Sequence, residues 1–215
     1  MLDLSAFNTS NVTDMSDMFV NCGVIKELDL QGFDTSKVTD MSCMFDQCYS
    51  MEELNICNFN TRNVTNMHNM FERCEMLAKL DLSSFDTSKV TDMSFMFYRC
   101  KLLNELDLSG FDTSNVTSMA VMFGLCTSLE ELDLSGFDMI NVNCVMGEVN
   151  EDNNYKMMNA LYACNSLKKI KTPSNCVLDV ELPKQLDEEH WYNSEGTLIE
   201  LLPKGLSESV TICKK

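Results

Sequence analysis

Hydrophobic and polar positions recur along this chain with a constant period of 26 residues. A short apolar, acidic, apolar segment opens each unit, and its first leucine stands at Leu2, Leu28, Leu54, Leu80, Leu106 and Leu132. Periods of roughly 20 to 50 residues are typical of chains in which each unit buries its apolar face only against its neighbours. The pattern therefore predicts about six stacked units over residues 1–172, followed by a capping segment over residues 173–215.

The pattern within a unit predicts a strand followed by a turn. Leu106 and Leu108 alternate with Asp107, which indicates a short strand with its leucines inward and its aspartate outward. Residues 109–114 are rich in serine, glycine, aspartate and threonine, whose side-chain oxygens can satisfy a bending backbone.

The methionine-rich end of each unit predicts a short helix. Met93, Met96, Phe97 and Cys100 stand at i, i+3, i+4 and i+7, which is the spacing of one apolar helix face. Thr91 or Asp92 is placed to cap the first turn of such a helix. Methionine surfaces can bind diverse partners, but this spacing favours packing inside the stack.

We call the equivalent positions of successive units a column. The columns combine into the motif C-x-x-L-x-x-L-D-L-S-x-F-D-T-S-x-V-T-x-M-x-x-M-F, which extends from residue 1 to about residue 172. The motif resembles the BspA-like leucine-rich repeat family of bacterial surface proteins, including a branch first described as an uncharacterised mycoplasma repeat. The resemblance implies an α/β solenoid, a right-handed leucine-rich-repeat superhelix with a parallel β-sheet on one face and short helices on the other. It also implies a small C-terminal β-hairpin cap, a location at the cell surface or outside the cell, and a role as an adhesin or binder of host ligands.

Composition narrows the classes of partner. The formal net charge of −17 and the pI near 4.3 disfavour nucleic acid and anionic membranes, because the electrostatic contribution to such binding would be repulsive. No run of about 18 apolar residues is present, so no direct membrane insertion is predicted. The chain begins inside a repeat without a signal peptide, and we expect either an excised fragment or a separate N-terminal partner segment.

Eleven cysteines at first suggest a disulfide scaffold. Six of them form one repeat column, where a cysteine can act as a small buried hydrophobe: Cys22, Cys48, Cys74, Cys100, Cys126 and Cys164. We therefore expect reduced thiols. The column lacks the paired C-x-x-C spacing of zinc sites, so no metal site and no cofactor are predicted.

The period breaks once, because 38 residues rather than 26 separate Leu132 from Ile170. This spacing indicates an insertion of about 12 residues near 143–156, which reads as an exposed loop. A calcium site is the alternative, since the loop carries oxygen ligands but matches no known calcium-loop spacing: Glu148, Asn150, Glu151, Asp152, Asn153 and Asn154.

After Pro173, the stretch WYNSEGTLIEL predicts a hairpin with its turn at residues 193–196. We expect this hairpin to cover the last repeat. A carbohydrate platform formed by Trp191 and Tyr192 is the less favoured alternative.

The outward strand positions form the candidate ligand-binding face. Its residues are Glu27, Asp29, Glu53, Asn55, Lys79, Asp81, Glu105, Asp107, Glu131 and Asp133. Carboxylates stacked at strand spacing repel one another unless a basic peptide, a basic protein patch or cations neutralise them. The other interpretation is a solvated, solubilising face.

An enzyme is not expected, because the chain holds only His68 and His190 and a cysteine nucleophile needs a histidine within hydrogen-bond reach. His68 occupies a position where other repeats have serine, so we interpret it as a surface substitution.

Three functions remain open. The first is a non-catalytic surface module that adheres to a host or neighbour-cell protein, including a basic one, through the acidic sheet face. The second is a structural spacer or stalk, and the third is an intracellular sensing repeat domain. The sequence does not predict an oligomeric state.

Overall fold

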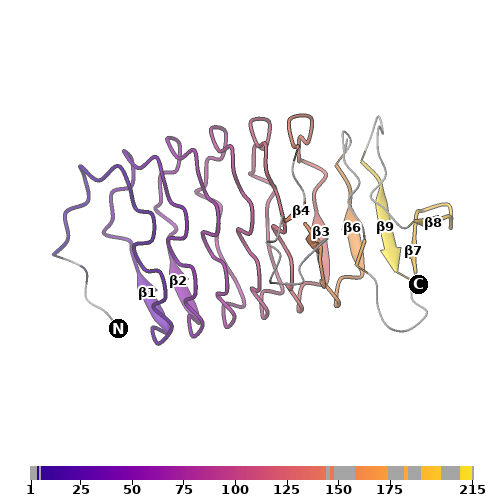
Figure 1. The fold of residues 1–215 in the computed structure, drawn as a ribbon, viewed down its shortest axis with the longest axis horizontal. Helices are drawn as coiled ribbons and strands as arrows, with labels where there is room; N and C mark the ends of the chain where they lie inside the picture. Colours follow the sequence, from indigo (N-terminus) through magenta and orange to yellow (C-terminus); the bar gives the residue numbers. More distant parts are fainter. Residues whose placement is uncertain are drawn as a thin grey trace.

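The repeats lie side by side in one row, with the two termini at opposite ends (Figure 1). This computed structural model describes residues 4, 6–143, 146–147, 158–173, 182–183, 190–199 and 209–214. We call each 26-residue unit a coil. Neighbouring coils are joined by backbone hydrogen bonds; for example, Phe45 N–H donates to the carbonyl oxygen of Met70 with an N···O distance of 2.9 Å.

Strands are short throughout the described part of the chain. They are β1 (Glu27–Asp29), β2 (Glu53–Asn55), β3 (Glu131–Asp133), β4 (Met146–Gly147), β5 (Met158–Asn159), β6 (Lys169–Lys171), β7 (Trp191–Tyr192), β8 (Leu198–Ile199) and β9 (Thr211–Lys214). Strand β1 pairs in parallel with β2, and β3 pairs in parallel with β6. Lys79 and Glu105 form an isolated parallel bridge between these two pairs.

The predicted α/β solenoid is wrong. The described residues contain no helix, and their strands form small separate sheets rather than one continuous parallel sheet. The 93–100 segment, predicted to be helical, is a run of tight turns in which Phe95 and Arg99 have φ angles of 58° and 62°. Residues in this left-handed region interrupt a right-handed helix. The same two positions are left-handed in neighbouring coils, at Asp17, Asn21, Cys43, Gln47, Asn69, Arg73, Val121 and Leu125.

The backbone amides of this segment explain why turns replace the helix. Alternate amides bond to the next coil: Phe95 N–H donates to Ala120 O at 2.8 Å, and Phe97 N–H donates to Met122 O at 2.9 Å. The amide between them, Met96 N–H, closes a turn by donating to Met93 O at 3.3 Å. A helix would direct every one of these amides four residues back and would leave the neighbouring coil unbonded.

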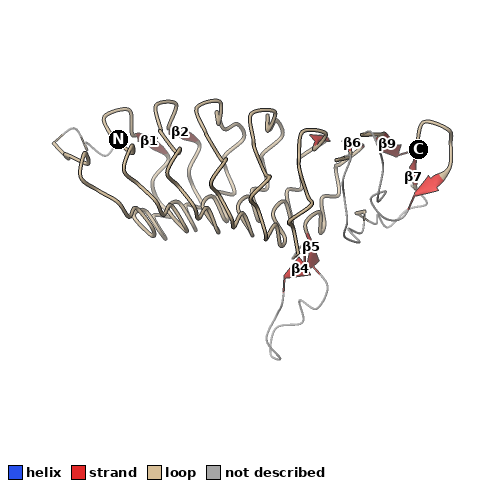
Figure 2. Ribbon diagram, turned by 90° about the horizontal axis from the view of Figure 1, so that it is seen from above, coloured by secondary structure: helices blue, strands red, loops and turns tan. Residues whose placement is uncertain are grey.

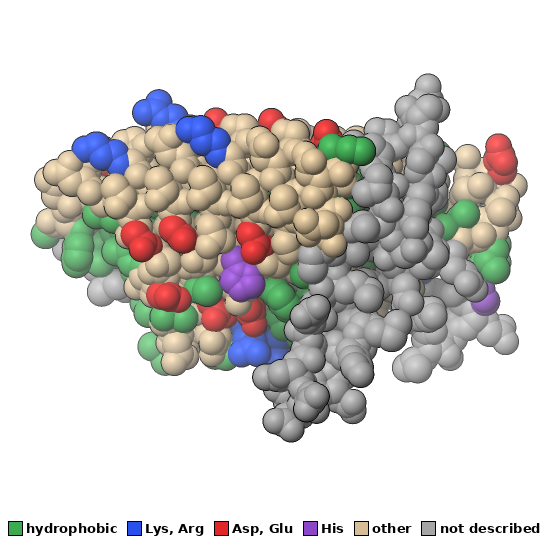
Figure 3. Space-filling view, turned by 45° about the horizontal axis from the view of Figure 1, so that its top comes forward, with side chains coloured by type: hydrophobic (Ala, Val, Ile, Leu, Met, Phe, Trp, Pro, Cys, Tyr) green, Lys and Arg blue, Asp and Glu red, His purple; other side chains and the backbone are tan. Residues whose placement is uncertain are grey.

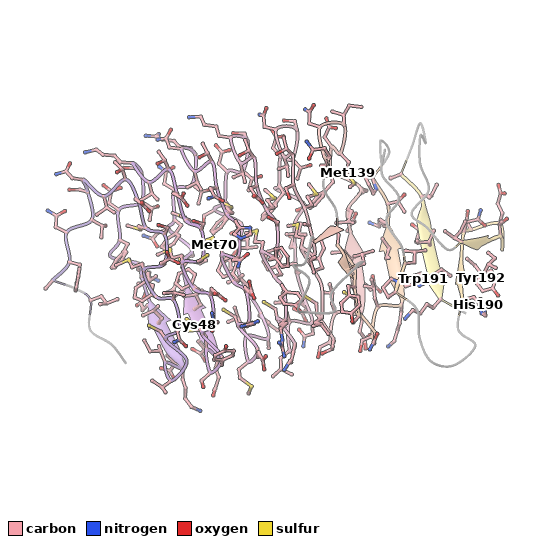
Figure 4. All side chains as sticks on the ribbon, viewed as in Figure 1. Cys48, Met70, Met139, His190, Trp191 and Tyr192 are labelled. Atoms are coloured by element: carbon pink, nitrogen blue, oxygen red, sulfur yellow. The ribbon has the colours of Figure 1, made fainter. Side chains whose placement is uncertain are left out.

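The core runs along the row between the turns and the strands. Both methionine columns are almost fully buried from the second coil onward, and Cys48 and Met70 lie within the stack (Figure 4). Five phenylalanine rings stack across successive coils with centroid separations of 5.6 to 5.8 Å: Phe19, Phe45, Phe71, Phe97 and Phe123. The predicted packing role of these columns is therefore confirmed.

The cysteine column bonds to the same phenylalanines. The Cys100 thiol donates to the carbonyl oxygen of Phe71 at an S···O distance of 3.1 Å, and Cys48, Cys74, Cys126 and Cys164 repeat this contact with the preceding coil. All nine cysteines in the described residues are free, which confirms the expected reduced thiols there. Burial raises the pKa of the Cys48 thiol to about 12, so the thiol remains a hydrogen-bond donor.

Buried threonines form a second ladder between coils. The Thr87 hydroxyl donates to Asp112 O at 2.9 Å and accepts from Asp112 N–H at 2.9 Å, so one side chain satisfies both backbone groups of the next coil. Thr9, Thr35, Thr61 and Thr113 occupy the equivalent position and are also buried. The ladder keeps successive Asp-Thr-Ser turns in register.

The C-terminal strands close the far end of the row. Strand β9 pairs antiparallel with β6 of the last coil, and the β7–β8 hairpin pairs through β7 with β9. The predicted hairpin and its turn are therefore present, but β9 rather than the hairpin contacts the last coil. Trp191 is 4% exposed, and its indole Nε1 donates to Pro183 O at 3.1 Å. This burial argues against a carbohydrate platform.

Strands β4 and β5 pair at the base of the insertion and project from the side of the row (Figure 2). The calcium-ligand candidates of the insertion, residues 148–154, lie outside the described residues, as does most of the 143–156 insertion. The described residues contain no helix long and apolar enough to cross a membrane.

Thr87→Val should lower the free energy of unfolding by about 1–3 kcal/mol, because the substitution removes the Thr87 hydroxyl that bonds both the N–H and the C=O of Asp112, which are partly buried. Urea denaturation checks this value. Thr91→Val is the matched control, since the Thr91 hydroxyl makes one exposed bond to Thr65 O and its loss should cost less than about 1 kcal/mol. Equal losses for the two variants would contradict the role of the buried ladder.

Candidate functional site

The ten predicted site residues are carried on the strand side of successive coils. All are exposed except Asn55, which is half-buried. The parallel register sets Glu27 opposite Glu53 and Asp29 opposite Asn55. The Glu27–Glu53 pair therefore places like charges at adjacent positions, as the sequence predicted, whereas Asn55 opposite Asp29 is neutral.

Lysines of neighbouring coils neutralise three carboxylates in the C-terminal half of this face, but not Asp107. Lys79 Nζ lies 2.9 Å from Glu105 Oε2, Lys169 Nζ lies 2.6 Å from Glu131 Oε2, and Lys171 Nζ lies 2.6 Å from Asp133 Oδ2. These pairs are exposed to solvent, so each contributes little to stability. Their main effect is to remove Glu105, Glu131 and Asp133 from the free charge of the face.

The aspartate column has a structural role that sequence reasoning did not assign. The Asp81 carboxylate accepts from Ser83 N–H at 3.0 Å, and the Asp107 carboxylate accepts from Ser109 N–H at 2.9 Å. The side-chain and backbone hydrogen bonds from Ser83 lower the pKa of Asp81. The same Asp-x-Ser turn recurs at residues 14–16, 34–36, 40–42, 86–88, 92–94, 112–114 and 133–135. Much of the acidic composition therefore supports turns.

Asp133 is the most strongly stabilised of these carboxylates. Partial burial raises its pKa, but hydrogen bonds from Lys171 and Ser135 outweigh that effect and hold the pKa at about 2. The Asp133 carboxylate is therefore charged across the physiological pH range, and Lys171 and Ser135 of the same chain already occupy it.

Five carboxylates of the strand face have no ion pair with a described lysine or arginine, and four of them, Glu27, Asp29, Glu53 and Asp81, surround a hollow over β1 and β2, whereas the fifth, Asp107, lies outside it. The hollow has a volume of about 320 Å³, and its lining is Glu27, Leu28, Asp29, Glu53, Leu54, Asn55, Ile56, Cys57 and Asp81. No described lysine or arginine forms an ion pair with the Glu27, Glu53 or Asp81 carboxylates. An apolar floor with carboxylates around it can accommodate the alkyl stem and cationic head of a basic side chain.

The opposite, turn-bearing side of the row holds a second cluster, which the sequence analysis missed. Asp46 and Glu72 occupy equivalent positions of adjacent coils and are 7% and 8% exposed. Their coils are joined by Gln47 N–H donating to Glu72 O at 2.8 Å. Asp46 Oδ2 accepts from Gln47 Nε2 at 2.9 Å, whereas the buried Asp46 Oδ1 has no hydrogen-bond partner.

Burial governs the ionisation of this pair. Burial, reinforced by the neighbouring Asp46 charge, raises the pKa of Glu72 to about 7, although Arg73 and Arg99 oppose the shift. Burial likewise raises the pKa of Asp46. The Arg73 Nε atom lies 3.2 Å from Glu72 Oε1 but makes no hydrogen bond there, so the geometry of this ion pair is poor. The sequence contains one signal of this cluster, because Asp46 and Glu72 are charged although the same column holds Val20, Tyr98 or Gly124 in other coils.

His68 also lies in a turn segment, and 38% of its side chain is exposed, which agrees with its interpretation as a surface substitution. Its Nδ1 is 2.8 Å from Ser94 Oγ, and Ser94 Oγ in turn donates to Asp92 Oδ1. The Phe95 ring contacts the imidazole edge-on at a centroid distance of 5.9 Å. Ser94 is buried, so this chain of bonds orients His68 rather than presenting a serine to solvent.

The two histidines do not meet, because His190 lies with Trp191 and Tyr192 at the C-terminal end (Figure 4). The described residues contain no group of three or more histidine, cysteine, aspartate or glutamate side chains arranged to hold a metal ion. Figure 3 shows acidic side chains repeated across neighbouring coils and basic side chains in separate groups.

One family model, described as "Mycoplasma protein of unknown function, DUF285", matches residues 1–80 and again residues 75–171. The two matches together cover the repeat region. Searches of curated proteins and of solved structures found no significant match.

Glu72→Gln should stabilise the protein at high pH. The raised pKa means that the stability contributed by Glu72 is fully present below about pH 4.5 and is lost as the pH rises through about 7. Glutamine resembles the protonated form, so the variant should gain roughly 1–2 kcal/mol at pH 8 and little at pH 4. Urea unfolding at both pH values measures the difference.

Glu52→Gln is the control for that comparison, because Glu52 is exposed and pairs with Lys26 at 2.6 Å. Its effect should stay below about 1 kcal/mol at both pH values. An equal effect of Glu72→Gln at pH 4 and pH 8 would show that Glu72 does not titrate as its burial requires.

Proposed function

Because this chain belongs to DUF285, a family of Mycoplasma proteins of unknown function, we propose a function from its own surface. We propose that it is a non-catalytic cell-surface or secreted adhesion module that binds a basic segment of a host or neighbour-cell protein. The binding surface is the acidic strand face, and its main contact region is the hollow over β1 and β2. No cofactor takes part in this function.

The single observation that carries the proposal is the uneven neutralisation of the strand face. Internal lysines pair with Glu105, Glu131 and Asp133, whereas Glu27 and Glu53 have no such pair among the described residues. Repulsion between adjacent carboxylates at β1 and β2 favours binding of an external cation there. Most of the free charge of the strand face lies around the hollow, which supports recognition of a lysine or arginine side chain.

We also propose that the chain is related to the BspA-like leucine-rich repeat surface proteins. It rests on the repeated Leu-Asp-Leu-Ser, Asp-Thr-Ser and Met-x-x-Met-Phe elements, of which residues 80–97 are a complete example. Members of that family are usually exported, which supports a surface location and adhesion rather than an internal role.

A structural spacer is the second candidate. It is favoured by the turn-forming role of the aspartates and by the lysine pairs, which allow the face to be stable without a ligand. A spacer would bind basic peptides no more tightly through the hollow than through any other acidic part of the surface.

A triple variant, Glu27→Gln with Glu53→Gln and Asp81→Asn, should bind a lysine-rich peptide about tenfold more weakly at low salt, because three exposed charge pairs contribute roughly 0.2–1 kcal/mol each. Asparagine at residue 81 keeps a turn acceptor, because Asn66 accepts from His68 N–H at 3.0 Å in the same kind of turn. Isothermal titration calorimetry at low and high salt measures the affinity.

The matched control changes the same amount of charge elsewhere. Asp34, Asp86 and Asp112 are exposed Asp-x-Ser residues of the Asp-Thr-Ser turns, and Asn60 occupies their column in another coil. Replacing all three with asparagine should change the peptide affinity by less than about twofold at moderate salt, where distant exposed charges are screened. Equal losses in the two triple variants would reject the hollow as the site and favour the spacer.

A further inference from the structure

One side of the hollow over β1 and β2 departs from the regular strand face. The outward column there reads Asp29, Asn55 and Asp81 in successive coils, so a neutral amide lies between two carboxylates, and all three residues line the hollow. Asn55 stands opposite Asp29 in the β1–β2 register and is half-buried. The hollow therefore offers an amide oxygen beside carboxylate oxygens rather than a continuous ladder of acids.

Asn55 also lacks the turn contact that its column neighbours make. Gln31 N–H donates to Asp29 Oδ1 at 3.1 Å, and Ser83 N–H donates to Asp81 Oδ1 at 3.0 Å. In the part of the chain that the structure describes, no residue forms a hydrogen bond with the Asn55 side chain. A half-buried amide oxygen without a protein donor is an acceptor that a ligand can use.

The backbone ladder is open next to this acceptor. Between β1 and β2, Leu30 N–H donates to Asn55 O at 3.1 Å. The equivalent bond of the next pair of coils, from Ile56 N–H to Asp81 O, does not form, and no strand pairing joins β2 to residues 79–81, all of which are described. The gap leaves the Asp81 carbonyl oxygen without a backbone donor among the described residues, in a residue that lines the hollow.

The gap alone does not distinguish the hollow. Residues 106–108 and 132–134 are likewise not joined by a backbone hydrogen bond. At that seam, however, Lys171 already neutralises Asp133, and no asparagine interrupts the aspartate column. The hollow is thus where free carboxylates, an unbonded amide and an open carbonyl occur together.

We propose that the hollow selects an arginine side chain over a lysine side chain, and that Asn55 is the residue that sets this preference. The inference rests on the proposed function, because it concerns the same site and the same basic ligand. The alkyl stem of the arginine lies on Leu54 and Ile56, which line the hollow. Its guanidinium donates to the Asn55 amide oxygen and to the carboxylate of Asp29 or Asp81.

The arrangement of the acceptors separates the two cations. Strands in a bonded ladder are about 4.8 Å apart, so the three acceptor residues are spread across three coils. Every N–H of an ammonium starts from one nitrogen, so spread acceptors compete for a compact charge. A guanidinium is planar and carries five N–H donors on separate nitrogens in a fixed fork, so the amide oxygen and a carboxylate can each accept from a different nitrogen.

Peptides that differ only in their basic residues test the preference on the unmodified chain. An arginine-rich peptide should bind about tenfold more tightly than the lysine-rich peptide of the same length and spacing, as measured by isothermal titration calorimetry at low salt. A third peptide carries dimethylated arginines, which keep the charge but lose N–H donors. Its affinity should fall to within about twofold of the lysine peptide, and this comparison does not depend on the folding of any variant.

A substitution at Asn55 tests the residue itself. Asn55→Ala removes the amide oxygen but no charge, so the ratio of arginine to lysine affinity should fall from about ten to about two. Cys57→Ala is the matched control, because Cys57 is exposed and lines the same hollow. This control should leave the ratio unchanged, and cooperative urea unfolding shows that both variants fold.

Equal affinities for the arginine and lysine peptides, undiminished binding of the dimethylated peptide, or an unchanged ratio in Asn55→Ala would each overturn the preference. The triple variant Glu27→Gln with Glu53→Gln and Asp81→Asn separates this failure from that of the proposed function. If it weakens both peptides while the unmodified chain does not discriminate between them, the hollow remains the site and only the arginine preference is wrong. If it binds both peptides as tightly as the unmodified chain does, the proposed function and the preference are wrong together.

Discussion

The hydrogen bond from one coil to the residue 25 positions later is the contact on which the rest of the structure depends. Phe45 N–H to Met70 O and Phe97 N–H to Met122 O are two members of this series. The ring stacks, the cysteine thiol bonds and the threonine ladder all occur because the series holds equivalent residues of adjacent coils together. None of these contacts can form within a single 26-residue unit.

The same constraint changes the meaning of the acidic composition. The backbone must bend several times in each coil, and Asp-x-Ser turns provide the acceptors for these bends. Lysines at coil spacing neutralise part of the charge that remains, as Lys79 does for Glu105. Four of the strand-face carboxylates that remain without a lysine partner lie together over β1 and β2, and this concentration rather than the net charge of −17 is the argument for a ligand surface.

The sequence predicted the period, the buried columns, the free thiols of the described cysteines and the hairpin near Trp191. It failed at the methionine-rich segment, because consecutive turns satisfy the same i, i+3, i+4 and i+7 spacing as a helix, and non-glycine residues such as Phe95 give no warning of a positive φ. The turn role of Asp81 could have been found from its spacing to Ser83. The burial of Asp46 and Glu72 depends on the neighbouring coil and could only be suspected from their column.

Deletion of whole and broken repeats tests the coil-to-coil register most directly. Removing residues 80–105 takes out one period of 26 and preserves the register of the backbone hydrogen bonds between the joined coils, whereas removing residues 80–104 shifts all later residues by one position. We expect the first variant to unfold cooperatively in urea with most of the original stability, and the second to lose its cooperative transition. Equal stability of the two variants would contradict the account.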